Sequence, residues 1–418
     1  MSARNSTVRA VNRLTSRWAE AAVAPDGRTG TVLTAAGVWP LLALLADGAG
    51  GPARAELAGA LGIPADGASA AARELLAALG RVRGLEAAAG LWARADLPLD
   101  PEWAARLPEG ARGGLTGDRA ADRKLLDEWA SARTGGLIER MPVQLTEHTR
   151  LVLASALALR LRWIRPFREW PGTIPEGPWA GREVLRLLRT TSLLHRVRVA
   201  GTPAGPVTVL EVVGDAGVDV HLVLGAPDAA AGRVLAGGIA AATRAVPWVD
   251  GFSLPEGTPG PGLRVGVGAA YRPEPRLSVD TVAFSVDAEH DLLEHAGLFG
   301  LETARTRAAA GHFPGVSRDP LLIESGSQSA MARFHAKGFE AAAVTAFGVA
   351  AGSGLLPPPP YRVRTIEVRF DRPFGFLAVQ RSSRLVLAAG WVAEPLAYVE
   401  AEYEEDWDDE EWEDEEWA

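Results

Sequence analysis

In the first third of the chain, apolar residues recur at spacings of three and four, which is the period of an amphipathic helix. Over residues 6–22 these positions are Val8, Val11, Leu14, Trp18 and Ala22, behind a Ser or Thr cap. The same criterion predicts helices over residues 35–46, 54–61, 70–79 and 123–133. Segment 35–46 is apolar on most sides, which indicates a buried helix, although an internal proline such as Pro40 kinks or breaks a helix.

Strand patterns dominate the later part of the chain. Residues 207–213 and 218–224 alternate apolar and polar side chains and flank the turn Gly214-Asp215-Ala216-Gly217, which predicts a β-hairpin. Further strands are predicted over residues 264–268, 282–286, 363–370, 375–379 and 385–391. Helices first and strands later, without βαβ alternation, indicate an α+β fold. No repeat and no linker divides the body.

Composition excludes several classes of site. The 418 residues are 47% hydrophobic and 23% charged, as in a globular protein with ample core. The absence of cysteine excludes disulfides, thiolate zinc sites and a cysteine nucleophile. Arg4, Arg9, Arg13 and Arg17 interrupt any signal-peptide core, and the longest apolar runs are about half of a membrane span. We therefore expect a cytoplasmic monomer with no membrane partner and no nucleic-acid partner.

Charge is distributed unevenly along the chain. Thirteen Asp or Glu and no basic residue lie in residues 400–418, which leaves 39 acidic against 43 basic residues in the body. Trp407, Trp412 and Trp417 recur every five residues in this tail, with four acids between neighbours. A dense charge block cannot bury a core, so we expect residues 396–418 to be disordered. The spaced tryptophans also suggest recognition of a basic surface, on a protease or on the body's own arginines.

A long segment near the C-terminus has the composition of a strand that could enter a sheet. It begins Gly338-Phe339-Glu340-Ala341-Ala342-Ala343-Val344-Thr345, passes Gly352-Ser353-Gly354 and ends at the four prolines 357–360. Between Ala341 and Leu356 there is neither charge nor proline, so the middle of a sheet could accept it. In a strand, Phe339, Ala341, Ala343, Thr345 and Phe347 would share one face. The alanines taken alone are more typical of a helix.

Four segments together resemble the serpin family, in its bacterial type. They are the segment just described, a helix with its turn, a strand with its flanks, and a C-terminal strand pair. In order, the last three read Leu126-Asp127-Glu128-Trp129 with Thr134-Gly135-Gly136-Leu137-Ile138; Thr149-Arg150-Leu151-Val152-Leu153-Ala154-Ser155-Ala156 with Arg162-Trp163 and Pro166-Phe167; and Asp371-Arg372-Pro373-Phe374 with Gly390-Trp391-Val392-Ala393-Glu394-Pro395. Their order and spacing, rather than any one of them, are specific.

The resemblance implies one domain over residues 5–395, a fold and an activity. The fold would have a mixed central sheet, two smaller sheets, eight or nine helices and an exposed reactive-centre loop over residues 338–361. The activity would be inhibition of a serine protease, or of a cysteine protease, by a suicide-substrate mechanism. The residues Val349-Ala350-Ala351-Gly352 would suit an elastase-like or subtilisin-like target. The cut loop would insert into the central sheet, and no cofactor or metal is implied. The alternative is a serpin-fold protein that does not inhibit and serves as a binding or chaperone-like module.

The scissile bond can be placed by counting from either end of the loop. The family's usual distance from hinge to scissile bond, counted from Gly338, reaches Gly352-Ser353. We prefer this bond, because the distance from the N-terminal end of the loop sets how far a bound protease is carried. The count back from Phe370 reaches Arg362, which would suit a trypsin-like enzyme. Phe347 and Leu355 are chymotrypsin-like alternatives.

Departures from the family pattern bear on how the sheet opens. The sheet-opening positions are Thr34, Gly37, Ser155 and Gln328, with Trp163 above them. Hydroxyl and amide groups supply donors and acceptors, so Thr34, Ser155 and Gln328 can form a hydrogen-bonded group. The hinge carries Phe339 where Ser or Thr is usual and Ala336 where Glu is usual. A bulky Phe339 could overpack the sheet by roughly 1–3 kcal/mol and slow insertion.

Sequence motifs typical of enzymes are incomplete in this chain. His290 and His295 are five residues apart, whereas two metal ligands on one helix face are four apart. Gly352-Ser353-Gly354 lacks the G-x-S-x-G pattern of a nucleophile elbow. We therefore expect no enzyme and no catalytic residue.

Overall fold

The computed structural model describes residues 5–108, 110–339 and 359–398. Within these ranges the chain forms three β-sheets, which we call the central, middle and end sheets, and eight α-helices. The helices are α1 (Asn5–Ala22), α2 (Ala35–Gly48), α3 (Gly51–Leu61), α4 (Ala68–Leu79), α5 (Pro101–Arg106), α6 (Arg119–Thr134), α7 (Ala231–Ala242) and α8 (Ala296–Phe299), with a 3-10 turn at Leu194–Arg196.

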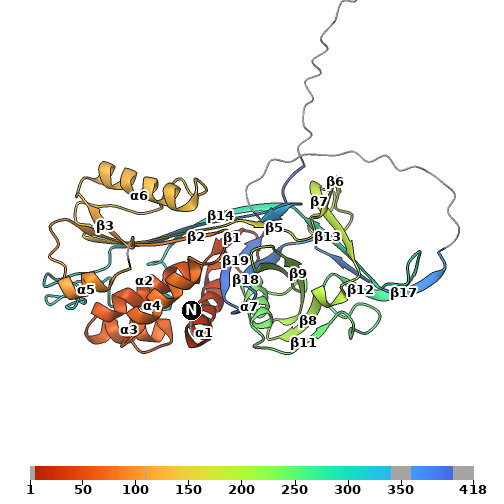
Figure 1. Cartoon of the computed structure of the whole chain (residues 1–418), viewed down its shortest axis with the longest axis horizontal. Helices are drawn as coiled ribbons and strands as arrows, with labels where there is room; N and C mark the ends of the chain where they lie inside the picture. Colours follow the sequence, from red (N-terminus) through yellow and green to blue (C-terminus); the bar gives the residue numbers. More distant parts are fainter. Residues whose placement is uncertain (1–4, 109, 340–358, 399–418) are drawn as a thin grey trace, which may run out of the picture.

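The central sheet runs through the middle of the molecule, with α6 on one side and α2, α3 and α4 on the other (Figure 1). Its order is β3-β2-β4-β15, with β14 on the far side of β15, and β16 and β5 continue it at one end. Its strands are β2 (Leu85–Arg94), β3 (Arg112–Leu115), β4 (Leu151–Leu159), β5 (Leu161–Arg162), β14 (Phe284–Asp291), β15 (Ser325–Phe334) and β16 (Gly338–Phe339).

The middle sheet packs against the central sheet and has the order β1-β19-β18-β10-β9-β8-β11. Its strands are β1 (Thr31–Leu33), β8 (Val197–Thr202), β9 (Gly205–Val213), β10 (Val218–Leu224), β11 (Trp248–Asp250), β18 (Phe374–Gln380) and β19 (Val386–Val392). Aromatic rings join the two sheets. Phe284 of β14 lies 5.2 Å from Phe334 of β15 and 5.1 Å from Phe376 of β18, measured between ring centroids.

The end sheet lies at the opposite end of the molecule from α3, α4 and α5 (Figure 1). Its order is β12-β17-β13-β7-β6. The strands are β6 (Arg168–Thr173), β7 (Glu183–Thr191), β12 (Leu263–Ala270), β13 (Arg276–Val282) and β17 (Tyr361–Arg369). β17 is the first described strand after residues 340–358, and it is held on both sides, by β12 antiparallel and by β13 parallel.

Most predicted elements are confirmed, with one correction. The hairpin forms as β9 and β10, with Val213 opposite Asp219. The strand predicted over residues 282–286 is wrong, because the chain changes sheets at Ala283, between β13 and β14. The buried helix predicted over residues 35–46 is confirmed as α2, which continues through Pro40 and has side chains buried on nearly every side. Packing therefore outweighs the local cost of the proline.

A buried carboxylate fixes the start of α6 over the central sheet. Asp122 accepts hydrogen bonds from Thr116 N at 2.7 Å, Thr116 Oγ1 at 2.8 Å and Gly117 N at 2.9 Å, while Asp118 caps the helix. Asp122 is only 4% exposed, so these bonds are shielded from water.

We predict that Asp122→Ala lowers the free energy of unfolding by about 2 kcal/mol, because three charge-assisted hydrogen bonds are lost. Chemical denaturation measures the change. Lys124→Ala is the matched control, since Lys124 is exposed on the same helix, and we expect a change under about 0.5 kcal/mol. A loss for Asp122→Ala no larger than that of the control would contradict the anchoring role.

Candidate functional site: the seam of the central sheet

The boundary between β4 and β15, which we call the seam, is a parallel ladder of six residue pairs. It runs from Ser325 opposite Val152 to Ala330 opposite Leu157. The two strands on either side are antiparallel to their neighbours, β2 to β4 and β14 to β15. The ladder stops before the strands do, because β15 continues to Phe334 and β4 to Leu159. The seam is therefore closed from Ser325 and Val152 to Ala330 and Leu157, which we call its lower part. The two strands part beyond these pairs, toward Phe334 and Leu159, at the end that we call the head of the seam.

The head of the seam is occupied by β16. Phe339 pairs with Phe334 of β15, and Gly338 and Phe339 pair with Arg162 and Leu161 of β5, which directly follows β4. Both pairings are antiparallel. β16 thus lies between the continuation of β4 and the end of β15, in the direction that a strand inserted between them would take.

Phe339 is buried in this arrangement. It is 2% exposed, and its ring centroid lies 6.0 Å from that of Phe376 in the middle sheet. The side chain that was expected to overpack the sheet is thus already buried at the head of the seam. Burial of this bulky apolar side chain stabilises β16 in that position.

Trp163 and Ala336 complete the head of the seam. The Trp163 indole Nε1 donates to the His335 carbonyl at 2.8 Å, its backbone N donates to Lys337 O at 3.0 Å, and its ring lies 4.9 Å from Phe334. Ala336 is 4% exposed, and its carbonyl accepts from Phe167 N at 2.8 Å. Because this position is buried, a small apolar side chain fits it without the desolvation of a charge.

Below the head, the predicted sheet-opening residues are only partly joined. Thr34 N donates to Gln328 Oε1 at 2.8 Å, and Gln328 Nε2 donates to Thr34 O at 2.9 Å. Thr34 also donates from Oγ1 to Leu387 O at 2.6 Å and caps α2 by accepting from Gly37 N at 3.3 Å. Gln328 and Thr34 therefore tie β15 to α2 and to β19 of the middle sheet.

Ser155 lies across the seam from Gln328 but is not bonded to it. The two residues are register partners, yet Ser155 Oγ has no hydrogen-bond partner in the described part of the chain and is fully buried. The hydroxyl lies over Gly37, where a Cβ would come within 2.2 Å of it. The expected group of three is thus a bonded pair plus an unpaired hydroxyl. No side-chain hydrogen bond of this cluster crosses the seam.

His290 belongs to the same region and was missed by the sequence analysis, which tested it only as a metal ligand. It pairs with Gln328 across β14 and β15. Its Nε2 donates to the Val32 carbonyl at 2.9 Å, and its ring packs edge-on against Trp18 at 5.1 Å. Burial lowers its pKa, and nearby His295 lowers it further, while the Val32 bond and Glu294 act against the shift. Only the cross-strand register could have revealed this role.

Other predicted features lie outside or away from the site. Residues 340–358, which include Glu340 to Thr345 and the Gly352-Ser353 bond, lie outside the described residues, as does the acidic tail from residue 399. Within the described ranges, no group of three His, Asp or Glu side chains could hold a metal ion. No helix in those ranges is long and apolar enough to cross a membrane.

Comparisons with known proteins identify what this architecture is similar to. The sequence model of the family described as serpin (serine protease inhibitor) matches residues 9–171. A rice protein (Oryza sativa subsp. japonica) assigned to the serpins as serpin-Z12 is 29% identical over 375 residues, covering 85% of this chain and 83% of its own.

Solved structures agree over nearly the whole chain. Thyroxine-binding globulin in complex with thyroxine has a TM-score of 0.66 at 17% identity, covering 94% of this chain and 99% of its own. Native protease nexin-1 with heparin has a TM-score of 0.67 at 15% identity, covering 94% and 98%. A serpin from the trematode Schistosoma haematobium has a TM-score of 0.63 at 14% identity, covering 94% and 100%. At these identities the likeness shows the fold.

The lowered pKa of His290 predicts a pH dependence. In the unfolded chain the imidazole takes up a proton near its ordinary pKa of about 6.5, whereas in the folded protein it does so only at lower pH. Unfolding therefore binds protons, and the folded state loses stability as the pH falls below about 6.5. We expect His290→Gln, which keeps an N–H donor, to flatten this loss between pH 6.5 and 5.

Chemical denaturation at several pH values measures this difference. A part of the loss remains in the variant, because buried His221 of β10 has its pKa lowered to about 4 by burial. Identical pH profiles for the variant and the parent would show that His290 does not contribute.

Proposed function

Because the chain belongs to the serpin family and has its fold, we propose that it inhibits a serine protease as a suicide substrate whose cut loop enters the seam. The observation that carries the proposal is the position of β16. Its two residues already form an antiparallel start between β5 and β15. An inserted strand would only have to extend this start downward as the six pairs of the seam separate.

The register of β16 sets where each inserted residue would lie. Continuing from Phe339 opposite Phe334, Ala343 would face Ala330 and Thr345 would face Gln328. Continuing from Phe339 opposite Leu161, Thr345 would face Ser155 on the other side. The two counts agree, since Gln328 and Ser155 are partners in the closed ladder. Thr345 would thus bring a hydroxyl beside the unpaired Ser155 Oγ.

The length of the seam favours one scissile bond. By the same register, residue 348 would face Ser325, the first residue of β15, and residue 349 would face Leu151, the first of β4. A chain cut at Gly352-Ser353 would fill the seam and extend just beyond it. Cleavage at Arg362 would leave the four prolines on the inserting strand, where they cannot donate to a ladder. We therefore propose Gly352-Ser353 and a target of the elastase or subtilisin type.

The energy of insertion is large enough to do mechanical work. About ten added ladder residues, at roughly 0.5–1.5 kcal/mol net per hydrogen bond, contribute on the order of 5–15 kcal/mol. That range equals the whole stability of a typical domain, so the uncleaved protein would be trapped kinetically. The buried, unpaired Ser155 hydroxyl favours opening further, because it costs about 1–3 kcal/mol only while the seam is closed.

The fold alone does not carry inhibition, since one of its solved relatives is a globulin that holds thyroxine. The second candidate is therefore a binding or chaperone-like protein whose loop is cut without insertion. The burial of Phe339 and its pairing with β5 count against this candidate, because they would favour insertion.

The first test is incubation of the intact protein with elastase, subtilisin, chymotrypsin and trypsin, followed by denaturing electrophoresis. We expect a covalent complex with an elastase-like or subtilisin-like enzyme. The variant Thr345→Arg would place a charge between Ser155 and Gln328, so its loop should be cut without a complex. Cleavage of the parent without any complex, and without a rise in melting temperature, would support the second candidate instead.

The second test separates the two states of the sheet through Ser155→Ala. In the intact protein we expect its free energy of unfolding to be unchanged or up to about 1 kcal/mol higher, because an unpaired buried hydroxyl is removed. In the cleaved protein we expect a loss of about 1 kcal/mol, because the bond to Thr345 is missing. Denaturation in guanidinium measures both forms, with Thr345→Val as the partner variant. A loss confined to the intact form would contradict the proposed register.

A further inference from the structure

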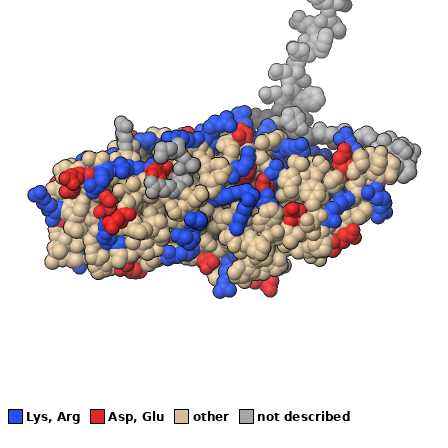
Figure 2. All heavy atoms as spheres, turned by 60° about the horizontal axis from the view of Figure 1, so that its bottom comes forward, with Lys and Arg blue, Asp and Glu red and all other residues tan. Residues whose placement is uncertain are grey.

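The outer face of the end sheet carries more arginine than its acids neutralise. Alternation along the strands places five arginines on this face, one from each strand, together with Asp280 and Glu367. The arginines are Arg168 of β6, Arg186 of β7, Arg276 of β13, Arg369 of β17 and Arg264 of β12. In the space-filling view, basic groups also gather across the middle of the molecule, away from the end where the end sheet lies (Figure 2).

Only two of the five arginines are paired. Asp280 binds Arg186 at 2.5 Å and Arg369 at 3.3 Å. In the described ranges, Arg168, Arg264 and Arg276 have no carboxylate within ion-pair distance, even though Glu367 is the register partner of Arg264. Three exposed or half-exposed guanidinium groups therefore remain available to an anionic partner.

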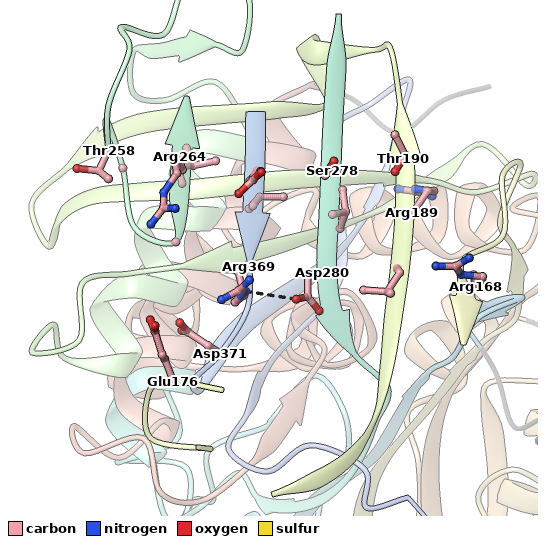
Figure 3. A pocket seen from close by; sticks show the side chains of 17 residues that line it. Arg168, Glu176, Arg189, Thr190, Thr258, Arg264, Ser278, Asp280, Arg369 and Asp371 are labelled. Atoms are coloured by element: carbon pink, nitrogen blue, oxygen red, sulfur yellow. Dashed lines mark ion pairs between the residues drawn. The ribbon is translucent and has the colours of Figure 1, made fainter. Parts of the chain in front are cut away.

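The same face is hollowed. A cavity of about 560 Å³ lies over the strands, and Arg168, Arg264 and Arg369 border it from three of them (Figure 3). Thr190 and Ser278 add hydroxyl groups, while Glu176 and Asp371 lie together at one end. Next to the cavity, Trp170 is 49% exposed, with the Arg168 guanidinium 5.4 Å from its ring centroid. The face thus offers positive charge, hydroxyls and an exposed aromatic ring.

The acidic tail starts beside this face. Ala397 bridges to Val184 of β7, and Tyr398 N donates to Glu183 O at 3.3 Å, at the N-terminal end of that strand. Arg186 is three residues further along β7, or about 10 Å. Arg168 is the register partner of Leu188, about 17 Å from Glu183. A flexible coil of twenty residues, the length of segment 399–418, would have a root-mean-square span of about 25 Å.

Because the tail is covalently attached to the body, even a weak attraction is sufficient to hold it on the outer face of the end sheet. A short flexible link holds two sites at an effective concentration in the millimolar range, so the tail needs only modest affinity for a surface within its reach. Its thirteen acids face a body of net charge about +4, and the three tryptophans can pack on apolar and guanidinium groups. A partner in trans must reach a comparable concentration to compete.

We propose that residues 399–418 dock onto the arginine-bearing outer face of the end sheet of their own chain. Because β17 is both part of this face and the strand that follows the reactive-loop segment, the docked tail would lie beside the anchor of that loop. The tail would then cover the unpaired arginines until a competing anion or high salt displaced it.

Energy transfer between two dyes tests the proposal in the full-length protein, which has no natural cysteine to interfere. One dye is placed at Ala418→Cys, and the other at Val267→Cys, which is 47% exposed on β12. A control pair uses Ala77→Cys on α4, at the other end of the molecule. At low salt we expect strong transfer to position 267 and weak transfer to position 77. In 0.5 M NaCl, transfer to 267 should fall about twofold or more as screening lengthens the distance.

Charge reversal distinguishes this face from the body's overall charge. Arg168→Glu, Arg264→Glu and Arg276→Glu combined should reduce transfer at low salt as much as 0.5 M NaCl does. The matched control reverses three exposed arginines elsewhere, Arg9, Arg73 and Arg112, and should change transfer little. Equal effects of the two triple variants would overturn the proposal. So would transfer that rises with protein concentration, which would assign the tail to a second copy. Because no protease is present, either result is independent of the proposed inhibition.

Discussion

The six-pair parallel ladder between β4 and β15 is the constraint on which the rest of the structure depends. It closes the central sheet, and every other part of the site bears on whether it stays closed. β16 lies at its head, between β5 and β15, and Gln328 joins β15 to Thr34 below. Among Thr34, Ser155 and Gln328, no side-chain hydrogen bond crosses from β4 to β15. The seam is therefore held mainly by its backbone ladder, which an inserted strand can replace on both sides.

The two strands that flank residues 340–358, β16 and β17, are anchored unequally. At the N-terminal end, β16 is two residues long and stands at the head of the seam. At the C-terminal end, β17 is held by eight residue pairs to β12 and five to β13. An intact loop could insert fully only if β17 left both neighbours, at the cost of both ladders. Under the proposed function, cutting the loop would remove that cost, so cleavage would be the favoured trigger for insertion.

How much could be predicted from the sequence depends on where the determining interactions lie. The helix over residues 6–22 and the hairpin of β9 and β10 follow from local periodicity, and the structure contains both. β2, which contains the helix-favouring run Glu86 to Ala89, is a strand because β4 and β3 pair with it on either side. The change of sheet at Ala283 likewise depends on strands that are distant in the sequence. It could not be read from the alternation of apolar and polar residues.

In the candidate site, too, some features could be predicted from the sequence and others depend on contacts between distant residues. Resemblance to a family placed Thr34 and Gln328 in one region, and the structure joins them by two hydrogen bonds. It could not show that Ser155 is unpaired, because that depends on the space left by Gly37. It also gave no reason to expect that Phe339 would already be buried, or that His290 would lie beside Gln328.

The most direct measurement of the central claim is a crystal structure of the protein after its loop has been cut. The account predicts a new strand between β4 and β15, antiparallel to both, with Thr345 between Ser155 and Gln328. Gln328 and Ser155 would then no longer be partners in one ladder. A cleaved protein in which Ser325 still faces Val152 and Ala330 still faces Leu157 would contradict it.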